Sequence, residues 1–216
     1  MANGAGASIT PFFTIWTEPR ATIRRIVDTE PTRYVIALAA IGPAINALTS
    51  QWSRALANNA NLSVLWPLWV VVDVAIQAAL GVVLLFALGA VFRWSGSLLG
   101  GVASQIEVRA ALAWSQVITI VGQTFLLIAV LLGVPLPAPA ATPAGMLPQI
   151  DPAFYKVMFV EGVLGVWGLV VSLKCLGEVH RFSAWRALAA ILIPPFIVIV
   201  VTGLIVFAIS RLTGHH

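Results

Sequence analysis

Two carboxylates, Asp73 and Glu161, lie within long apolar stretches of the sequence, where acidic residues are rare. An ionised carboxylate in hydrocarbon costs about 2.5–3.5 kcal/mol on insertion scales, so each of these side chains requires a proton or a polar partner. Counted at a helical rise from the nearest end of its stretch, each lies about 12 Å deep. Three more polar residues fall near that depth, and the predicted polar layer consists of Asp73, Glu161, Gln123, Thr124 and Thr202.

This polar layer has two interpretations. In the functional one, its groups line a polar pocket or ion path of a small transporter or channel. In the structural one, they hold helices together through hydrogen bonds that are typically worth about 0.6–2 kcal/mol each. We expect the structural role, and we keep transport as the alternative.

A second set of polar residues lies at the basic ends of the apolar stretches. It consists of Arg93, Glu107, Arg109, Glu178, His180, Arg181 and Arg186. One histidine with separated carboxylates is a poor ligand set for a metal, so we predict an ion-pair face exposed to headgroups instead of a metal or acid–base site. The sequence contains no nucleophile elbow, metalloprotease motif or phosphate-binding loop. We therefore expect no catalytic residues, no cofactor and no enzymatic activity.

Five apolar stretches must position these residues, and they predict the fold class. They span residues 34–50, 66–92, 108–134, 153–175 and 187–210. About 20 apolar residues in helical form cross a hydrocarbon core about 30 Å thick, and lipid offers the backbone no hydrogen bonds. The sequence therefore predicts an all-α, polytopic bundle of five transmembrane helices. Its 60% hydrophobic and 9% charged residues agree with this class, because soluble proteins carry about 25% charged residues.

Basic residues gather on one side of the predicted bundle. That side collects Arg20, Arg24, Arg25, Arg33, Arg93, Arg109, Lys174, Arg181 and Arg186, whereas the other holds Arg54, Lys156 and Arg211. The positive-inside rule then predicts a cytoplasmic N-terminus and, after five spans, an outer C-terminus. The net charge of +4 is dispersed over helix ends and forms no basic stripe with interleaved aromatics. Anionic lipid headgroups are therefore the expected partners, and nucleic acid is not.

Two further segments have a predicted local structure. Residues 1–32 form an N-terminal segment ahead of the membrane domain, 33–216, and contain an amphipathic helix with Ile23, Ile26 and Val27 on one face. This helix either lies in the headgroup layer or packs under the bundle. Pro194 and Pro195 within the last stretch remove two backbone donors and predict a kink. The proline-rich segment 135–152 is predicted to be extended.

Four short motifs, in order along the chain, resemble bacterial Yip1-family membrane proteins. They are WTEPRATIRRIVDTEP at 16–31, RWSGSLLGG at 93–101, EVRAALAWS at 107–115 and GEVHRFSAWRAL at 177–188. The resemblance implies five helices, a cytoplasmic N-terminus and an outer C-terminus. In one departure, Gln116 follows Trp114-Ser115 where the family often has a proline shortly afterwards. Eukaryotic relatives are associated with vesicle trafficking and prenylated small GTPases, which a bacterial chain would lack, so the resemblance implies fold more than activity.

From these observations we predict a multi-pass protein of the bacterial inner membrane that acts as a non-enzymatic scaffold or interaction module. The alternative is a small transporter or channel that uses the layer around Asp73 and Glu161, and an enzyme acting on lipid ranks third. The expected partners are membrane lipids, further copies of the chain, or other membrane proteins.

Overall fold

Helices account for nearly all of the chain that the computed structural model describes, which is residues 10–57, 64–134 and 152–213. They are α1 (Thr10–Thr17), α2 (Pro19–Thr29), α3 (Val35–Ala57), α4 (Trp66–Leu98), α5 (Gln105–Leu131), α6 (Pro152–Val179) and α7 (Ala184–Thr213). The described residues contain no strand, and the last five helices are long and apolar enough to cross a membrane. The predicted all-α class with five candidate spans is confirmed. The extended segment predicted at 135–152 lies, except for Pro152, outside the described residues.

The helix ends follow local chemistry. Pro67 stands in the first turn of α4, where its missing N–H needs no partner. Ser104 and Glu107 form a capping box at the start of α5: Ser104 Oγ accepts from the Glu107 backbone N–H, and Glu107 Oε2 accepts from the Ser104 N–H at 2.6 Å. At the end of α3 the helix continues beyond the predicted apolar stretch 34–50 to Ala57 and includes the polar residues Gln51 and Arg54.

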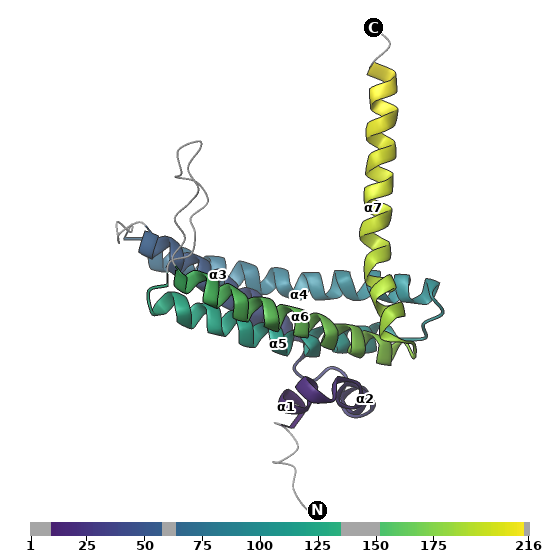
Figure 1. Cartoon of the computed structure of the whole chain (residues 1–216), viewed down its shortest axis with the longest axis horizontal. Coiled ribbons are helices and arrows are strands. Elements are labelled where there is room, and N and C mark those ends of the chain that lie inside the picture. Colours follow the sequence, from purple (N-terminus) through teal and green to yellow (C-terminus); the bar gives the residue numbers. More distant parts are fainter. Residues whose placement is uncertain (1–9, 58–63, 135–151, 214–216) are drawn as a thin grey trace, which may run out of the picture.

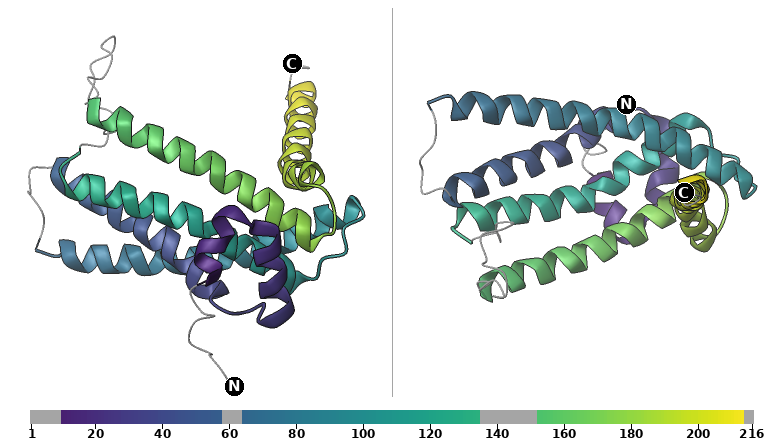
Figure 2. Two further views of the ribbon diagram at one scale, coloured as in Figure 1. Left: turned by 60° about the horizontal axis from the view of Figure 1, so that its bottom comes forward. Right: turned by 90° about the horizontal axis from the view of Figure 1, so that it is seen from above.

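The helices α3 to α6 lie side by side in one layer in the order α4, α3, α5, α6 (Figures 1 and 2). The most extensive contacts join α3 to α4, α5 to α6, and α3 to α5. As an inner helix of the layer, α5 carries much of the buried core, including Val108, Trp114 and Ile118. In this order, α4 and α6 form the two edges of the layer.

The N-terminal helices α1 and α2 pack against one side of this layer near the end where α7 begins (Figure 1). The apolar face of α2 is buried, with Ile23 inaccessible and Ile26 nearly so, and the helix contacts α5 and α6. Of the two placements expected for this amphipathic helix, the structure shows packing under the bundle. Protein, instead of lipid, covers its apolar face.

The last helix, α7, leaves the bundle. It begins between α4 and α6 and then runs across the direction of the layer, away from it (Figures 1 and 2). Ala187 and Ala190 near its start are fully buried, whereas every residue from 195 to 211 is exposed. The helix is continuous through Pro194 and Pro195, which mark the point where its contacts with the layer end.

Candidate functional site

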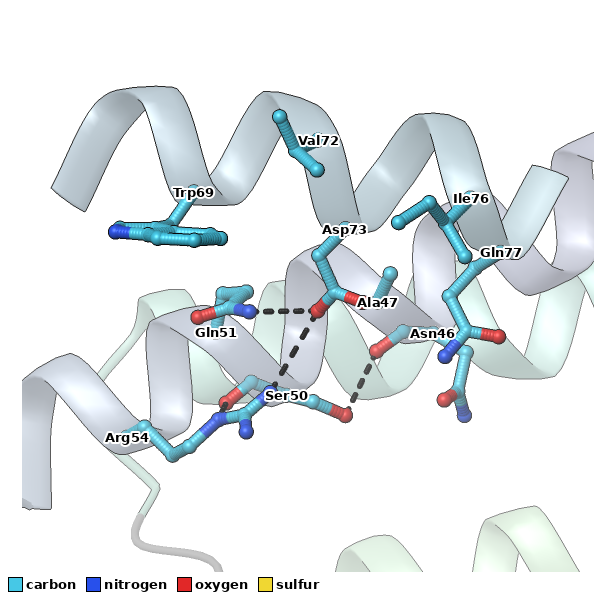
Figure 3. Close-up of a pocket in the computed structure, with 10 residues that line it drawn as sticks. All are labelled: Asn46, Ala47, Ser50, Gln51, Arg54, Trp69, Val72, Asp73, Ile76 and Gln77. Atoms are coloured by element: carbon cyan, nitrogen blue, oxygen red, sulfur yellow. Dashed lines mark hydrogen bonds and ion pairs between the residues drawn. The ribbon is translucent and has the colours of Figure 1, made fainter. Parts of the chain in front are cut away.

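The carboxylate of Asp73 is held between α4 and α3. Gln51 Nε2 donates a hydrogen bond to Asp73 Oδ2 at 2.6 Å, and Arg54 Nη2 lies 3.6 Å from the same oxygen (Figure 3). Both partners belong to the part of α3 that lies beyond the predicted apolar stretch 34–50. The Asp73 side chain is 27% exposed. An amide and a guanidinium therefore compensate this carboxylate, as a charge at membrane depth requires.

A pocket of about 540 Å³ opens beside Asp73 between the two helices (Figure 3). Amides, a hydroxyl and an indole line it together with apolar groups. Its residues are Asn46, Ala47, Ser50, Gln51, Arg54, Trp69, Val72, Asp73, Ile76 and Gln77. This lining offers hydrogen bonds to a small polar ligand, while Arg54 offsets the negative charge that would attract a cation.

Glu161 of α6 faces α5 at a glycine. A methyl group added to Gly122 would lie 3.1 Å from Glu161 Oε2, so the carboxylate would have to shift slightly if this residue carried a side chain. Glu161 Oε1 and Gln123 Oε1 are both buried and have no hydrogen-bond partner among the described residues. Thr124 donates to the backbone oxygen of Ile120 in its own helix at 2.8 Å. The groups of this second site do not form a shared hydrogen-bond network.

The structure does not bring the predicted polar layer together. Asp73 binds across the α3–α4 contact, whereas Glu161 lies in the α5–α6 contact on the opposite edge of the layer. Thr202 lies on the exposed part of α7, away from both. The depth count placed these residues at similar heights, but helix order and the departure of α7 separate them laterally.

On the basic side, Glu178 at the end of α6 binds two arginines of α2. Arg24 reaches Glu178 Oε1 with Nη2 at 2.7 Å and with Nε at 3.1 Å, and Arg20 Nη1 reaches Oε2 at 3.1 Å. The hydrogen bond to Glu178 raises the pKa of Arg24 above its usual value. The predicted ion-pair face did not include Arg20 or Arg24. Their spacing of four residues on an amphipathic helix, and the acidic Glu178 at the end of a predicted span, were the signals in the sequence that could have indicated this contact.

The other members of the predicted ion-pair face are placed differently. Glu107 caps α5, and the Arg109 guanidinium lies 4.1 Å from the centre of the Phe86 ring. Within the described ranges, Arg93, Arg181 and Arg186 make no ion pair. Of the seven residues of the predicted face, only Glu178 forms ion pairs in the described part of the chain, so the face is not a continuous network.

His180 is buried, not exposed with this face. It is 1% exposed, stacks on Phe182 with ring centres 5.0 Å apart, and packs against Gly96 and Gly101, where any side chain would collide with the imidazole. Burial lowers the pKa of His180, and neither ring nitrogen has a hydrogen-bond partner in the described part of the chain. No group of three metal-ligating side chains occurs among the described residues. His180 therefore joins the α6–α7 turn to the α4–α5 turn by packing.

Comparison with known proteins identifies a family. Residues 13–206, most of the chain, match the Yip1 domain. This match confirms the resemblance carried by the four sequence motifs. Neither a curated protein nor a solved structure matches the chain.

Proposed function

Because the chain belongs to the Yip1 domain family and carries five helices fit to cross a membrane, we propose that it is a non-enzymatic scaffold or interaction module of the bacterial inner membrane. The N-terminus is cytoplasmic and the C-terminus lies outside, as the distribution of arginine and lysine requires. Its partners are lipids and other helical membrane proteins or further copies of itself.

The observation that carries this proposal is the exposed part of α7. Every residue from 195 to 208 is exposed, and this segment is apolar except at Thr202. Lipid tails are as apolar as such a helix, so its association depends on close packing at small residues. Gly203 offers such a place, because nothing lies within 4 Å of a methyl group added there. An unpartnered helix that leaves its own bundle is suited to contact another membrane protein.

The environment of Asp73 also supports an interaction role over transport. A coupling carboxylate must exchange its proton or cation, whereas Asp73 is held by Gln51 and Arg54 from a neighbouring helix. Such contacts fix the position of two helices.

Cross-linking in native membranes tests the proposal. A cysteine at Leu204, on the exposed part of α7, is expected to give cross-linked species with a short bifunctional maleimide. A cysteine at Ile36, exposed at the start of α3, is the matched control. Cysteine placement starts from a Cys175→Ser background, which removes the free thiol. Cross-linking of the total membrane protein shows that the reagent is active. If the Leu204→Cys variant stays monomeric under these conditions, an interaction through α7 is contradicted.

A small transporter or channel remains the second candidate, because the pocket beside Asp73 has room and polar groups for a small solute. Solute and ion flux into proteoliposomes distinguishes the two functions. The scaffold predicts no flux above empty vesicles. Robust flux by the original protein that disappears in folded Asp73→Asn or Glu161→Gln variants would establish transport instead.

A further inference from the structure

Two hollows are lined in part by residues of α1. The polar hollow, about 240 Å³, is lined by Arg25, Thr29, Glu30, Arg33, Tyr34 and Trp114, among others. The apolar hollow, about 560 Å³, is lined by residues that include Phe12, Phe13, Trp16, Leu38, Val117 and Val121. The second volume lies within the range of about 300–1,000 Å³ that is usual for small-molecule sites.

Phe12 lines the apolar hollow and contacts two residues of the polar hollow. Its ring centre lies 5.9 Å from that of Tyr34 and 4.8 Å from that of Trp114, and both of these residues line the polar hollow. Leu38, in the first turn of α3, lies four residues after Tyr34, and Val117 follows Trp114 by nearly one turn of α5. Polar lining near Tyr34 and Trp114 is therefore followed along the chain by apolar lining on α3 and α5.

The polar hollow has an excess of donors. Glu30 Oε2 accepts a hydrogen bond from Arg33 Nη1 at 3.1 Å, and the other N–H groups of this guanidinium leave donors for a further acceptor. Arg25 has no ion-pair partner among the described residues. Trp114 is 2% exposed, and its indole N–H has no acceptor in the described part of the chain. A buried donor without a partner is costly, so an acceptor from outside the chain would be favoured here.

The backbone at the mouth supports a built site. Tyr34 has a φ of 59°, a left-handed conformation that a bulky residue rarely adopts. This conformation accompanies the contact of its ring with Phe12 and Trp114, while its hydroxyl accepts from Arg33 Nη2 at 3.2 Å. Backbone conformations of this kind persist where the surroundings enforce them, and they are frequent at ligand sites.

We propose that the two hollows together bind one anionic membrane phospholipid. Its phosphate accepts hydrogen bonds from Arg25 and Arg33, and one acyl chain lies in the apolar hollow between α1 and the pair α3–α5. Guanidinium groups suit phosphate because they can donate two parallel hydrogen bonds. A free phosphate would leave the apolar hollow unfilled. A phospholipid would fill both hollows, and its headgroup would lie at the basic end of the helices, where anionic headgroups are expected. This site is independent of the role proposed for α7.

Lipid retention by the purified full chain tests the proposal, with phosphatidylglycerol as the probe and native mass spectrometry as the readout. The double variant Arg25→Gln/Arg33→Gln is expected to weaken retention about tenfold, the effect of losing about 1.4 kcal/mol of binding. The matched control, Arg93→Gln/Arg186→Gln, removes two arginines outside the hollow and is expected to retain the lipid as the original chain does. Equal retention by both double variants, or an equal loss in both, would overturn the proposal.

A second pair of variants tests the acyl chain. Val121→Trp fills the apolar hollow and is expected to reduce retention, whereas Val163→Trp, on the exposed surface of α6, is expected to leave it unchanged. Circular dichroism melting confirms that each variant is folded. Soluble glycerol phosphate is expected not to displace the lipid at equal concentration. If it does, the site recognises free phosphate and the phospholipid proposal is wrong.

Discussion

Arg24 and Glu178 are 154 residues apart in the sequence, yet Arg24 Nη2 lies 2.7 Å from Glu178 Oε1 and also donates to the Glu178 backbone oxygen at 3.3 Å. The pair ties α2 to the end of α6, two residues before His180. Helix α2 is thereby fixed next to the turn that connects α6 to α7.

The first prediction concerns this tie. Glu178→Gln removes the charge that holds Arg20 and Arg24, and we expect it to destabilise the docking of α2 by about 1 kcal/mol, because the pair is partly solvated. Hydrogen exchange of the α2 amides should become faster. Glu30→Gln is the control, since it breaks the exposed Arg33 pair and leaves α2 docked. Unchanged exchange in Glu178→Gln would show that apolar packing alone holds the helix.

The second prediction concerns Asp73. Asp73→Asn keeps an acceptor for Gln51, so its thermal stability in detergent should fall only slightly. Asp73→Leu leaves the Gln51 amide and Arg54 without their partner and should cost about 1–3 kcal/mol. The order of the two melting temperatures is the measurement. A leucine variant as stable as the asparagine variant would contradict a structural role for the carboxylate.

The third prediction concerns the close approach of α5 to Glu161. Gly122→Ala brings a methyl group to 3.1 Å from Glu161 Oε2, so the carboxylate must shift by a few tenths of an ångström, and we expect a small loss of stability. Adding Glu161→Ala should recover part of this loss, which a double-mutant cycle on unfolding free energy would measure. Gly162→Ala is the control, because open space surrounds a methyl group there. Purely additive effects would show that the two residues are not in contact.

The fourth prediction is a pH dependence from His180. Burial lowers its pKa in the folded protein, while the unfolded chain keeps a value near 6.5. The unfolded state therefore binds more protons on acidification, and stability should be full above about pH 7 and fall as the pH drops below about 6.5. Melting temperatures between pH 7.5 and 5.5 should show the decline in the original chain and a flatter profile in His180→Gln. Parallel profiles would exclude His180 as the cause.

The fifth prediction is the topology. In the Cys175→Ser background, a cysteine at Ala141, outside the described residues, should be labelled from outside intact cells, and one at Ser97 should be protected. Ser97 is exposed in the last turn of α4, whereas its neighbour Gly96 has no room for a side chain beside His180. The reverse labelling pattern would contradict the orientation inferred from the basic residues.

The sequence alone determined the helices and the membrane class. Runs of apolar residues longer than a bilayer needs can satisfy their backbone in lipid only as helices, so the five spans follow from hydropathy without knowledge of their neighbours. The motifs around Pro19, Gly96, Trp114 and His180 also sufficed to indicate the family.

The tertiary structure decided which polar residues meet. The sequence gives only the depth of a residue along its helix, and by depth Asp73, Glu161 and Thr202 form one group. The order of the helices and the direction of α7 decide the lateral positions, and they separate these three residues. Charge type alone placed His180 on an exposed face, whereas the glycines of another turn provide space for it inside the protein. Gln51 and Arg54 are partners of Asp73 because α3 continues beyond the predicted apolar stretch 34–50 and lies beside α4. Hydropathy depends on each segment separately, but these contacts depend on how the segments pack.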